Sequence, residues 1–132
     1  MANALYPKWK ESVIQANSNS SLTGSLKIAL IDTGTYTYSS SHQFLSSLTG
    51  VVGTAQTLSN KTFVNGVLDA SDVTFTAVTG ATVEAYVIYI DTGVAGTSQL
   101  VAYVDTGVTN LPVTPNGGDI SIQFNASGIF QI

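Results

Sequence analysis

The strongest β pattern in the chain lies between residues 82 and 106. Two runs rich in Val, Ile and Tyr, at 83–90 and 100–104, are separated by a segment that contains Gly93 and Gly96. This arrangement predicts a β-hairpin. Nearly every position of the first run is apolar or aromatic, so we expect both faces of that strand to be covered, either inside a sandwich or at a subunit contact.

Shorter β-prone runs occupy much of the remaining chain. Leu26, Ile28 and Leu30 alternate with polar or small residues, which is typical of a strand. Further runs lie at 51–52, 62–64, 67–68, 73–75, 120–124 and 129–130. Turn-forming segments such as Asn65-Gly66 separate them, and this spacing predicts a mainly β chain folded as an antiparallel β-sandwich or barrel-like domain.

The spacing of apolar residues predicts one short helix near the N-terminus. Pro7 suits the first turn of a helix, and Trp9, Val13 and Ala16 then fall on one stripe at helical spacing. We therefore expect a helix that begins at Pro7 and ends near Ala16, within an N-terminal arm of residues 1–17.

A second short helix is expected over residues 41–48. Ser40 and Gln43 have the spacing of a capping box, in which the hydroxyl accepts from a first-turn amide and the glutamine side chain bonds back to the cap. Gly50 follows at the expected end of this helix.

Length and charge limit the classes of function. The chain has 132 residues, which predicts a single domain over 1–132. Charged residues make up only 9% of it, arginine is absent and the net charge is −4, so we expect no nucleic-acid partner. No segment approaches the ~18 apolar residues of a membrane span, and we expect a soluble protein without a membrane partner.

Cysteine is absent and His42 is the only histidine, so the thiolate and imidazole ligands of a typical zinc site are missing. We therefore expect no metal and no cofactor. The sequence places His42 in the first turn of the second helix, where we expect it to face solvent.

Three copies of hydrophobic-Asp-Thr-Gly, with their carboxylates at Asp32, Asp91 and Asp105, are the one pattern that suggests catalysis. Aspartic proteases carry this tripeptide at a pair of carboxylates that share a proton. Three copies are too many for one such pair, and two of them bracket the predicted hairpin. We interpret them as turns, in which Asp bonds the backbone two residues on and Gly is left-handed, and we expect no enzymatic activity.

Several segments form a combination that extends over nearly the whole chain. They are Ala4-Leu5-Tyr6-Pro7-Lys8-Trp9-Lys10, Lys27-Ile28-Ala29-Leu30-Ile31-Asp32-Thr33-Gly34, Tyr36-Thr37-Tyr38, Ser41-His42-Gln43-Phe44-Leu45, Asn65-Gly66-Val67-Leu68-Asp69-Ala70, Asp72-Val73-Thr74-Phe75 and Leu111-Pro112-Val113-Thr114-Pro115-Asn116-Gly117-Gly118-Asp119-Ile120. In this combination the chain resembles a family of small virion structural proteins of tailed bacteriophages. Within that family it is most similar to capsid cement, or decoration, proteins.

The resemblance implies a structural protein of the virion that is made in the cytoplasm of a bacterial host. Cement proteins sit on the capsid exterior at local threefold positions, usually as trimers. The resemblance therefore implies two partners, the phage major capsid protein and further copies of this chain in a homotrimer. The implied function is to stabilise the capsid lattice by bridging its subunits non-covalently.

Two groups of apolar residues are candidates for subunit or capsid contacts. One group clusters in residues 1–9, which have little else in their own segment to fold against. The other lies on the doubly apolar strand of the predicted hairpin. The six residues are Leu5, Tyr6, Trp9, Tyr86, Ile88 and Tyr89.

Two other functions are open at this point. A tail or fibre component of a phage would also be trimeric and rich in β-structure. A glycan-binding β-sandwich would use Tyr36, Tyr38 and Trp9 as stacking platforms. Aromatic side chains gathered on an exposed face would favour glycan binding, whereas aromatic side chains buried between subunits would favour cement.

Overall fold

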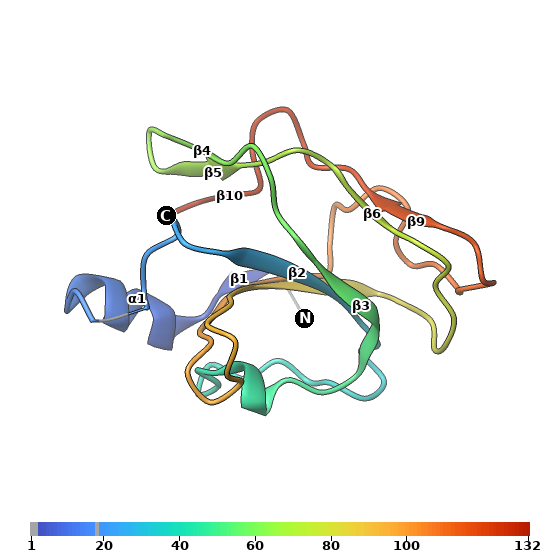
Figure 1. Cartoon of the computed structure of the whole chain (residues 1–132), viewed down its shortest axis with the longest axis horizontal. Coiled ribbons are helices and arrows are strands. Elements are labelled where there is room, and N and C mark those ends of the chain that lie inside the picture. Colours follow the sequence, from blue (N-terminus) through green and yellow to red (C-terminus); the bar gives the residue numbers. More distant parts are fainter. Residues whose placement is uncertain (1–2, 18) are drawn as a thin grey trace.

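The computed structural model describes residues 3–17 and 19–132 and has two β layers (Figure 1). A five-stranded sheet forms one layer, and a three-stranded and a two-stranded sheet lie above it. The strands are β1 (Ala4–Leu5), β2 (Leu26–Ile31), β3 (Val51–Thr57), β4 (Thr62–Val64), β5 (Val67–Asp69), β6 (Val73–Phe75), β7 (Ala85–Ile90), β8 (Leu100–Val104), β9 (Ile120–Ile122) and β10 (Phe130–Gln131).

The mainly β, antiparallel class expected from the sequence is confirmed, and the described strands form no closed barrel. Helical structure in these ranges consists of α1 (Pro7–Ile14) and the 3-10 helix η1 (Leu45–Ser47). Neither helix is long and apolar enough to cross a membrane.

The predicted hairpin forms the middle of the five-stranded sheet, whose order is β1-β8-β7-β2-β3. Strands β7 and β8 are antiparallel, with Tyr86 opposite Val104. Strand β2 pairs with the other edge of β7, where Leu26 lies opposite Ile90. Every residue of β7 and β8 is buried, which confirms that both faces of the first hairpin strand are covered.

The two small sheets cover one face of this large sheet. Strands β4 and β5 are joined by Asn65-Gly66, and both residues have positive φ (52° and 77°), as a tight hairpin turn requires. Strand β10 pairs with β5 on the other side, and β6 pairs with β9. The resulting sheet orders are β10-β5-β4 and β6-β9.

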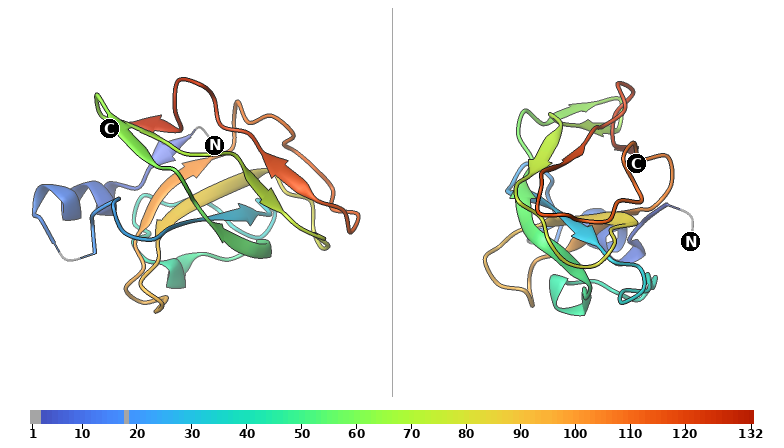
Figure 2. Two further views of the ribbon diagram at one scale, coloured as in Figure 1. Left: turned by 45° about the horizontal axis from the view of Figure 1, so that its top comes forward. Right: turned by 90° about the vertical axis from the view of Figure 1, so that its right-hand side faces the viewer.

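Two loops, residues 32–50 and 91–99, cover the opposite face, as the views in Figures 1 and 2 show. The backbone joins them: the Leu45 N–H donates to the Ser98 carbonyl (2.7 Å), and the Leu100 N–H donates to the Gln43 carbonyl (2.9 Å). Strand β7 is therefore enclosed within one chain. Its apolar composition follows from that enclosure and needs no subunit contact.

The N-terminal segment forms one edge of the large sheet. Ala4 lies opposite Tyr103 in the pairing of β1 with β8, and the Tyr6 N–H donates to the Val101 carbonyl (2.9 Å). The expectation that this segment has little to fold against is therefore wrong for the described residues. Met1 and Ala2 lie outside those residues.

Helix α1 continues this attachment through Trp9. The indole Nε1–H donates to the Ser20 carbonyl (2.9 Å), and the ring packs edge-on against Phe130 with 6.0 Å between centroids. Because Trp9 and Phe130 belong to opposite ends of the chain, their contact joins α1 to the upper layer. Trp9 is 1% exposed and belongs to the core.

The buried face of α1 differs from the predicted stripe. Pro7 begins the helix as expected, but the helix ends at Ile14 and Ala16 has a left-handed φ of 54°. Trp9 and Ser12 are its buried residues, whereas Val13 is exposed. The predicted buried stripe of Trp9, Val13 and Ala16 is wrong for two reasons. The helix ends before Ala16, and the side that it packs against the domain contains Trp9 and Ser12.

The second short helix expected within residues 41–48 is present as the 3-10 helix η1 (Leu45–Ser47), which is shorter than the expected range. The residue before η1, Phe44, is extended and makes no side-chain cap. Phe44 forms an isolated antiparallel bridge with Gln99 in the neighbouring loop. Pairing between the two loops thus takes the backbone groups that a helix would have used, so tertiary contacts override the capping pattern of Ser40 and Gln43.

We predict that Trp9→Ala lowers the free energy of unfolding by about 3–5 kcal/mol, because it removes a buried indole and leaves a cavity. Val13→Ala, on the exposed side of the same helix, should change it by less than about 1 kcal/mol. Urea denaturation of both variants measures the difference. Equal midpoints would contradict the packing of α1 described above.

Candidate functional site

The three Asp-Thr-Gly segments lie at the ends of three strands. Asp32 follows β2, Asp91 follows β7 and Asp105 follows β8. Because β7 is antiparallel to both neighbours, Asp91 lies at the opposite end of the sheet from the other two. Asp32 and Asp105 lie at one end with β7 between their strands.

Two of these aspartates form the predicted turns. Asp32 Oδ1 accepts the Gly34 N–H (2.9 Å), and Asp91 Oδ1 accepts the Gly93 N–H (3.0 Å). Gly93 has a left-handed φ of 86°, but Gly34 does not have a left-handed φ. The interpretation of the glycine is therefore wrong for the first copy, where backbone bonds from Thr35 and Tyr36 to the Asp32 carbonyl form the turn.

The third copy closes the sheet edge in a different way. The backbone N–H groups of Asp105 and Thr106 donate to Asn3 Oδ1 (2.7 and 2.9 Å), and Thr106 Oγ1 donates to Asp105 Oδ1 (2.7 Å). Gly107 has a left-handed φ of 74°. This turn holds the N-terminal segment against the end of β8.

Five of the six predicted contact residues are buried inside the chain. They are Tyr6, Trp9, Tyr86, Ile88 and Tyr89, each no more than 6% exposed. Leu5 is half-buried and lines an apolar hollow of about 160 Å³ beside β8. The core of this chain explains the apolar character of the five, so a surface contact has to be sought elsewhere.

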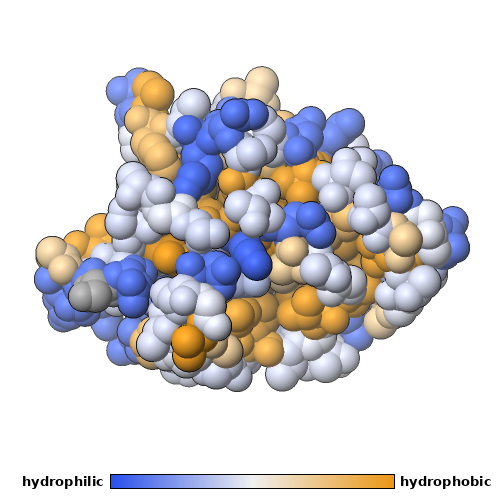
Figure 3. Space-filling view, in the orientation of Figure 1, coloured by the Kyte–Doolittle hydropathy of each residue, from blue (hydrophilic) through white to orange (hydrophobic). Residues whose placement is uncertain are grey.

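The tip of the β4–β5 hairpin is such a surface. Phe63, Val64 and Ile132 are 48%, 62% and 60% exposed, and we call these three residues the hairpin tip surface. The Ile132 N–H donates to the Gly66 carbonyl (2.9 Å), which places the end of the chain beside the turn. In Figure 3 apolar side chains are visible on the part of the molecule that projects where Figure 1 shows this hairpin.

Residues 62–64 are expected to form a strand from the sequence, but they are not among the residues expected at a contact surface. A signal was present, because successive residues of a strand point to opposite faces. Phe63 and Val64 are adjacent and apolar, and a three-residue strand next to a tight turn cannot bury both.

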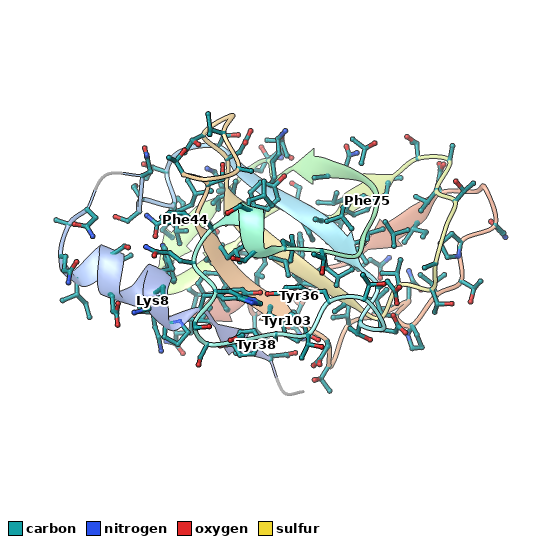
Figure 4. The ribbon with its side chains drawn as sticks, turned by 90° about the horizontal axis from the view of Figure 1, so that it is seen from below. Lys8, Tyr36, Tyr38, Phe44, Phe75 and Tyr103 are labelled. Atoms are coloured by element: carbon teal, nitrogen blue, oxygen red, sulfur yellow. The ribbon has the colours of Figure 1, made fainter. Side chains whose placement is uncertain are left out.

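A second surface feature is a groove of about 300 Å³ below the five-stranded sheet. It is lined by Thr33, Tyr36, Thr37, Tyr38, Glu84, Tyr103 and Asp105, and we call it the tyrosine groove. Figure 4 shows Tyr36, Tyr38 and Tyr103 gathered on this underside. The ring centroids of Tyr38 and Tyr103 are 5.5 Å apart, and those of Tyr36 and Tyr103 are 6.3 Å apart.

A chain of hydrogen bonds fixes the inner wall of the tyrosine groove. The hydroxyls of Tyr6 and Tyr36 are 2.8 Å apart, and the Tyr36 hydroxyl is 2.8 Å from His42 Nδ1. His42 is half-buried, so the expectation that it faces solvent on a helix is wrong. Within residues 3–17 and 19–132, no three His, Asp or Glu residues converge on a possible metal site.

Burial extends to higher pH the range over which the tyrosines of this region stay protonated, because it raises their pKa. It raises the pKa of Tyr103 to about 12, and the neighbouring Asp105 carboxylate adds to the rise. Burial, followed by the hydrogen bond with Tyr36, raises the pKa of Tyr6 far above its ordinary value. At neutral pH these hydroxyls are therefore hydrogen-bond donors as well as acceptors.

The aromatic platform expected for glycan binding does not form from its three residues. Trp9 and Tyr36 are 1% and 2% exposed, and stacking on a sugar requires an open ring face. Tyr38 alone of the three is half-buried and reaches the surface. Trp9 lies against Phe130, whereas Tyr38 lies against Tyr6 and Tyr103, so the three do not share one exposed face.

No protein-family model matches this chain, and a search of curated proteins finds no significant match.

We predict that the protein loses stability as the pH rises from about 10 to about 12. The pKa of Tyr103 is about 12 in the folded chain, against an ordinary value of 10.0. The unfolded chain therefore releases this proton first, so the stabilisation present below pH 10 is lost as the pH rises through the folded-state pKa. Urea denaturation at a series of pH values measures the loss. Tyr103→Phe should make this dependence shallower, and an unchanged slope would contradict the assignment.

Proposed function

We propose that this protein is a capsid cement protein of a tailed bacteriophage, which binds the outer surface of the head and bridges neighbouring subunits of the major capsid protein. The sequence resemblance supports the virion assignment. The observation that carries the proposal is the hairpin tip surface, where three large apolar side chains are exposed on one projection of the domain. A protein that acts only by binding needs such a surface and no reacting groups.

The chemistry of the tip suits contact with another protein. Exposed apolar patches on soluble proteins often mark protein contacts, and here Ile132 lies against the turn that joins the strands of Phe63 and Val67. Strand β4 also pairs on one side only, with β5, among the described strands, so its other edge offers backbone groups to a partner. Thr62, Phe63 and Val64 carry no charge that would oppose such a partner.

Assembly would turn this modest contact into firm attachment. A homotrimer presents three tips, and once one tip is bound the other two bind at a high effective concentration. The resemblance to cement proteins supports the trimer. The apolar residues of β7 give no support to the trimer, because they are already buried within one chain.

We predict that Val64→Asp weakens binding to capsids at least roughly tenfold, because burying a valine contributes about 1.5–3 kcal/mol and the new carboxylate would have to be desolvated. Val94→Asp is the matched control, since Val94 is 59% exposed and Val64 is 62% exposed. Val94 lies in the 91–99 loop on the other side of the large sheet. Co-sedimentation with capsids that lack the protein measures both variants, and equal losses would exclude the tip as the contact.

The function itself is tested with particles assembled with and without the protein. After heating or osmotic shock, particles that carry the protein should retain more DNA, because bridging holds the shell against internal pressure. Equal retention would exclude a cement function. A density map that places the protein only on the tail would favour the alternative of a tail or fibre component.

A further inference from the structure

We propose that the tyrosine groove receives an arginine side chain of a partner protein, and that it forms a second contact surface of this protein. The inference rests on the proposed function only in taking the capsid protein as that partner. The groove lies below the large sheet, whereas the hairpin tip surface lies in the layer above it. A bridging protein needs two surfaces that can face different neighbours, and these two lie on opposite sides of the large sheet.

The groove brings one accessible aromatic ring and a carboxylate together. Tyr38 is half-buried and reaches the surface, the buried Tyr103 packs against it with 5.5 Å between ring centroids, and Glu84 lines the same space. Aromatic faces attract cations, and the guanidinium of arginine stacks on them through its flat surface. A volume of about 300 Å³ is enough for the end of one long side chain.

Glu84 has one carboxylate oxygen available to such a ligand. Its Oε1 accepts the Thr33 N–H (3.1 Å), which fixes the orientation of the carboxylate. Within the described residues no donor is placed on Oε2. An arginine N–H could therefore bind Oε2 without breaking the bond to Thr33, and a charge-assisted bond of this kind is stronger than a neutral one.

The charged side chains of this protein favour a cation supplied from outside. No lysine lines the groove. Lys8 pairs with Glu11, Lys27 pairs with Asp91, and Lys61 donates to the carbonyls of Leu22 and Gly24. Lys10 is exposed on α1. The chain contains no arginine, so a second copy of it cannot supply the proposed ligand.

Asp105 contributes negative charge to the rim. It already accepts a hydrogen bond from Thr106, and it also bonds Tyr103, so the proposal requires no new bond from it. The negative charge in the groove opposes the binding of anions. Arginine is favoured over lysine because only a planar guanidinium can stack on Tyr38 while it donates in its own plane to Glu84.

The test uses the full chain and three small probes: N-acetyl-arginine amide, N-acetyl-lysine amide and N-acetyl-citrulline amide. Citrulline has nearly the shape of arginine but no charge. Aromatic NMR signals of Tyr38 and Tyr103 report binding. We expect shifts with the arginine probe that weaken as salt is added, weaker shifts with lysine and none with citrulline.

Glu84→Gln removes the charge and keeps an oxygen that can accept from Thr33. It should weaken binding of the arginine probe roughly tenfold, and Tyr38→Ala should do the same by removing the stacking face. Glu11→Gln, an equal loss of charge on exposed α1, is the control and should leave binding unchanged. The folded state of each variant is checked by its NMR spectrum.

The proposal would be overturned by no shifts with the arginine probe, by equal shifts with citrulline, or by equal weakening by Glu84→Gln and Glu11→Gln. Tighter binding of lysine than of arginine would also overturn it and would favour a contact with another copy of this chain. None of these results tests the hairpin tip surface. Capsid binding that survives them would leave the proposed function in place without the groove.

Discussion

The enclosure of β7 and β8 on both faces is the constraint on which the rest of the fold depends. All their residues are buried, so nearly every backbone group in them needs a partner inside the protein. Strand β2 completes the pairing of β7, and β1 with the Tyr6 amide completes part of the outer edge of β8. The small sheets above and the two loops below then exclude water from the side chains.

This arrangement explains why residues 3–9 are part of the domain and do not form a detachable arm. Ala4 and Leu5 pair with β8, and Tyr6 and Trp9 fill space in the core. Trp9 also contacts Phe130 near the other end of the chain. An apolar N-terminal cluster is therefore part of the domain, and the contact surfaces of the molecule are formed by other residues.

Buried tyrosines on the underside of the large sheet combine apolar packing with hydrogen bonding. A side chain there must fill space against apolar strands and also satisfy polar groups of the covering loop. Tyr6 and Tyr36 do both, because their rings are buried while their hydroxyls bond each other and reach His42. The same network holds Tyr36 at the wall of the groove, so packing of the core also shapes the surface proposed for ligand binding.

Local pattern determined most of the strands but not β1, together with the central hairpin, the start of α1 at Pro7 and the bonds of Asp32 and Asp91 to the backbone two residues on. These features depend on neighbours within a few residues, which the sequence displays directly. The second helix is limited to the single turn η1 for the opposite reason, since the bond of Gln43 with Leu100 and that of Leu45 with Ser98 fix the backbone before it. The tyrosine groove joins residues from the 32–50 loop to Glu84, Tyr103 and Asp105, and the hairpin tip surface joins residue 63 to residue 132. Only the tertiary structure could show where these two sites lie, because the exposure of a side chain depends on which distant segments cover it. The sequence shows that a residue is apolar, but it does not show whether that residue is buried or exposed.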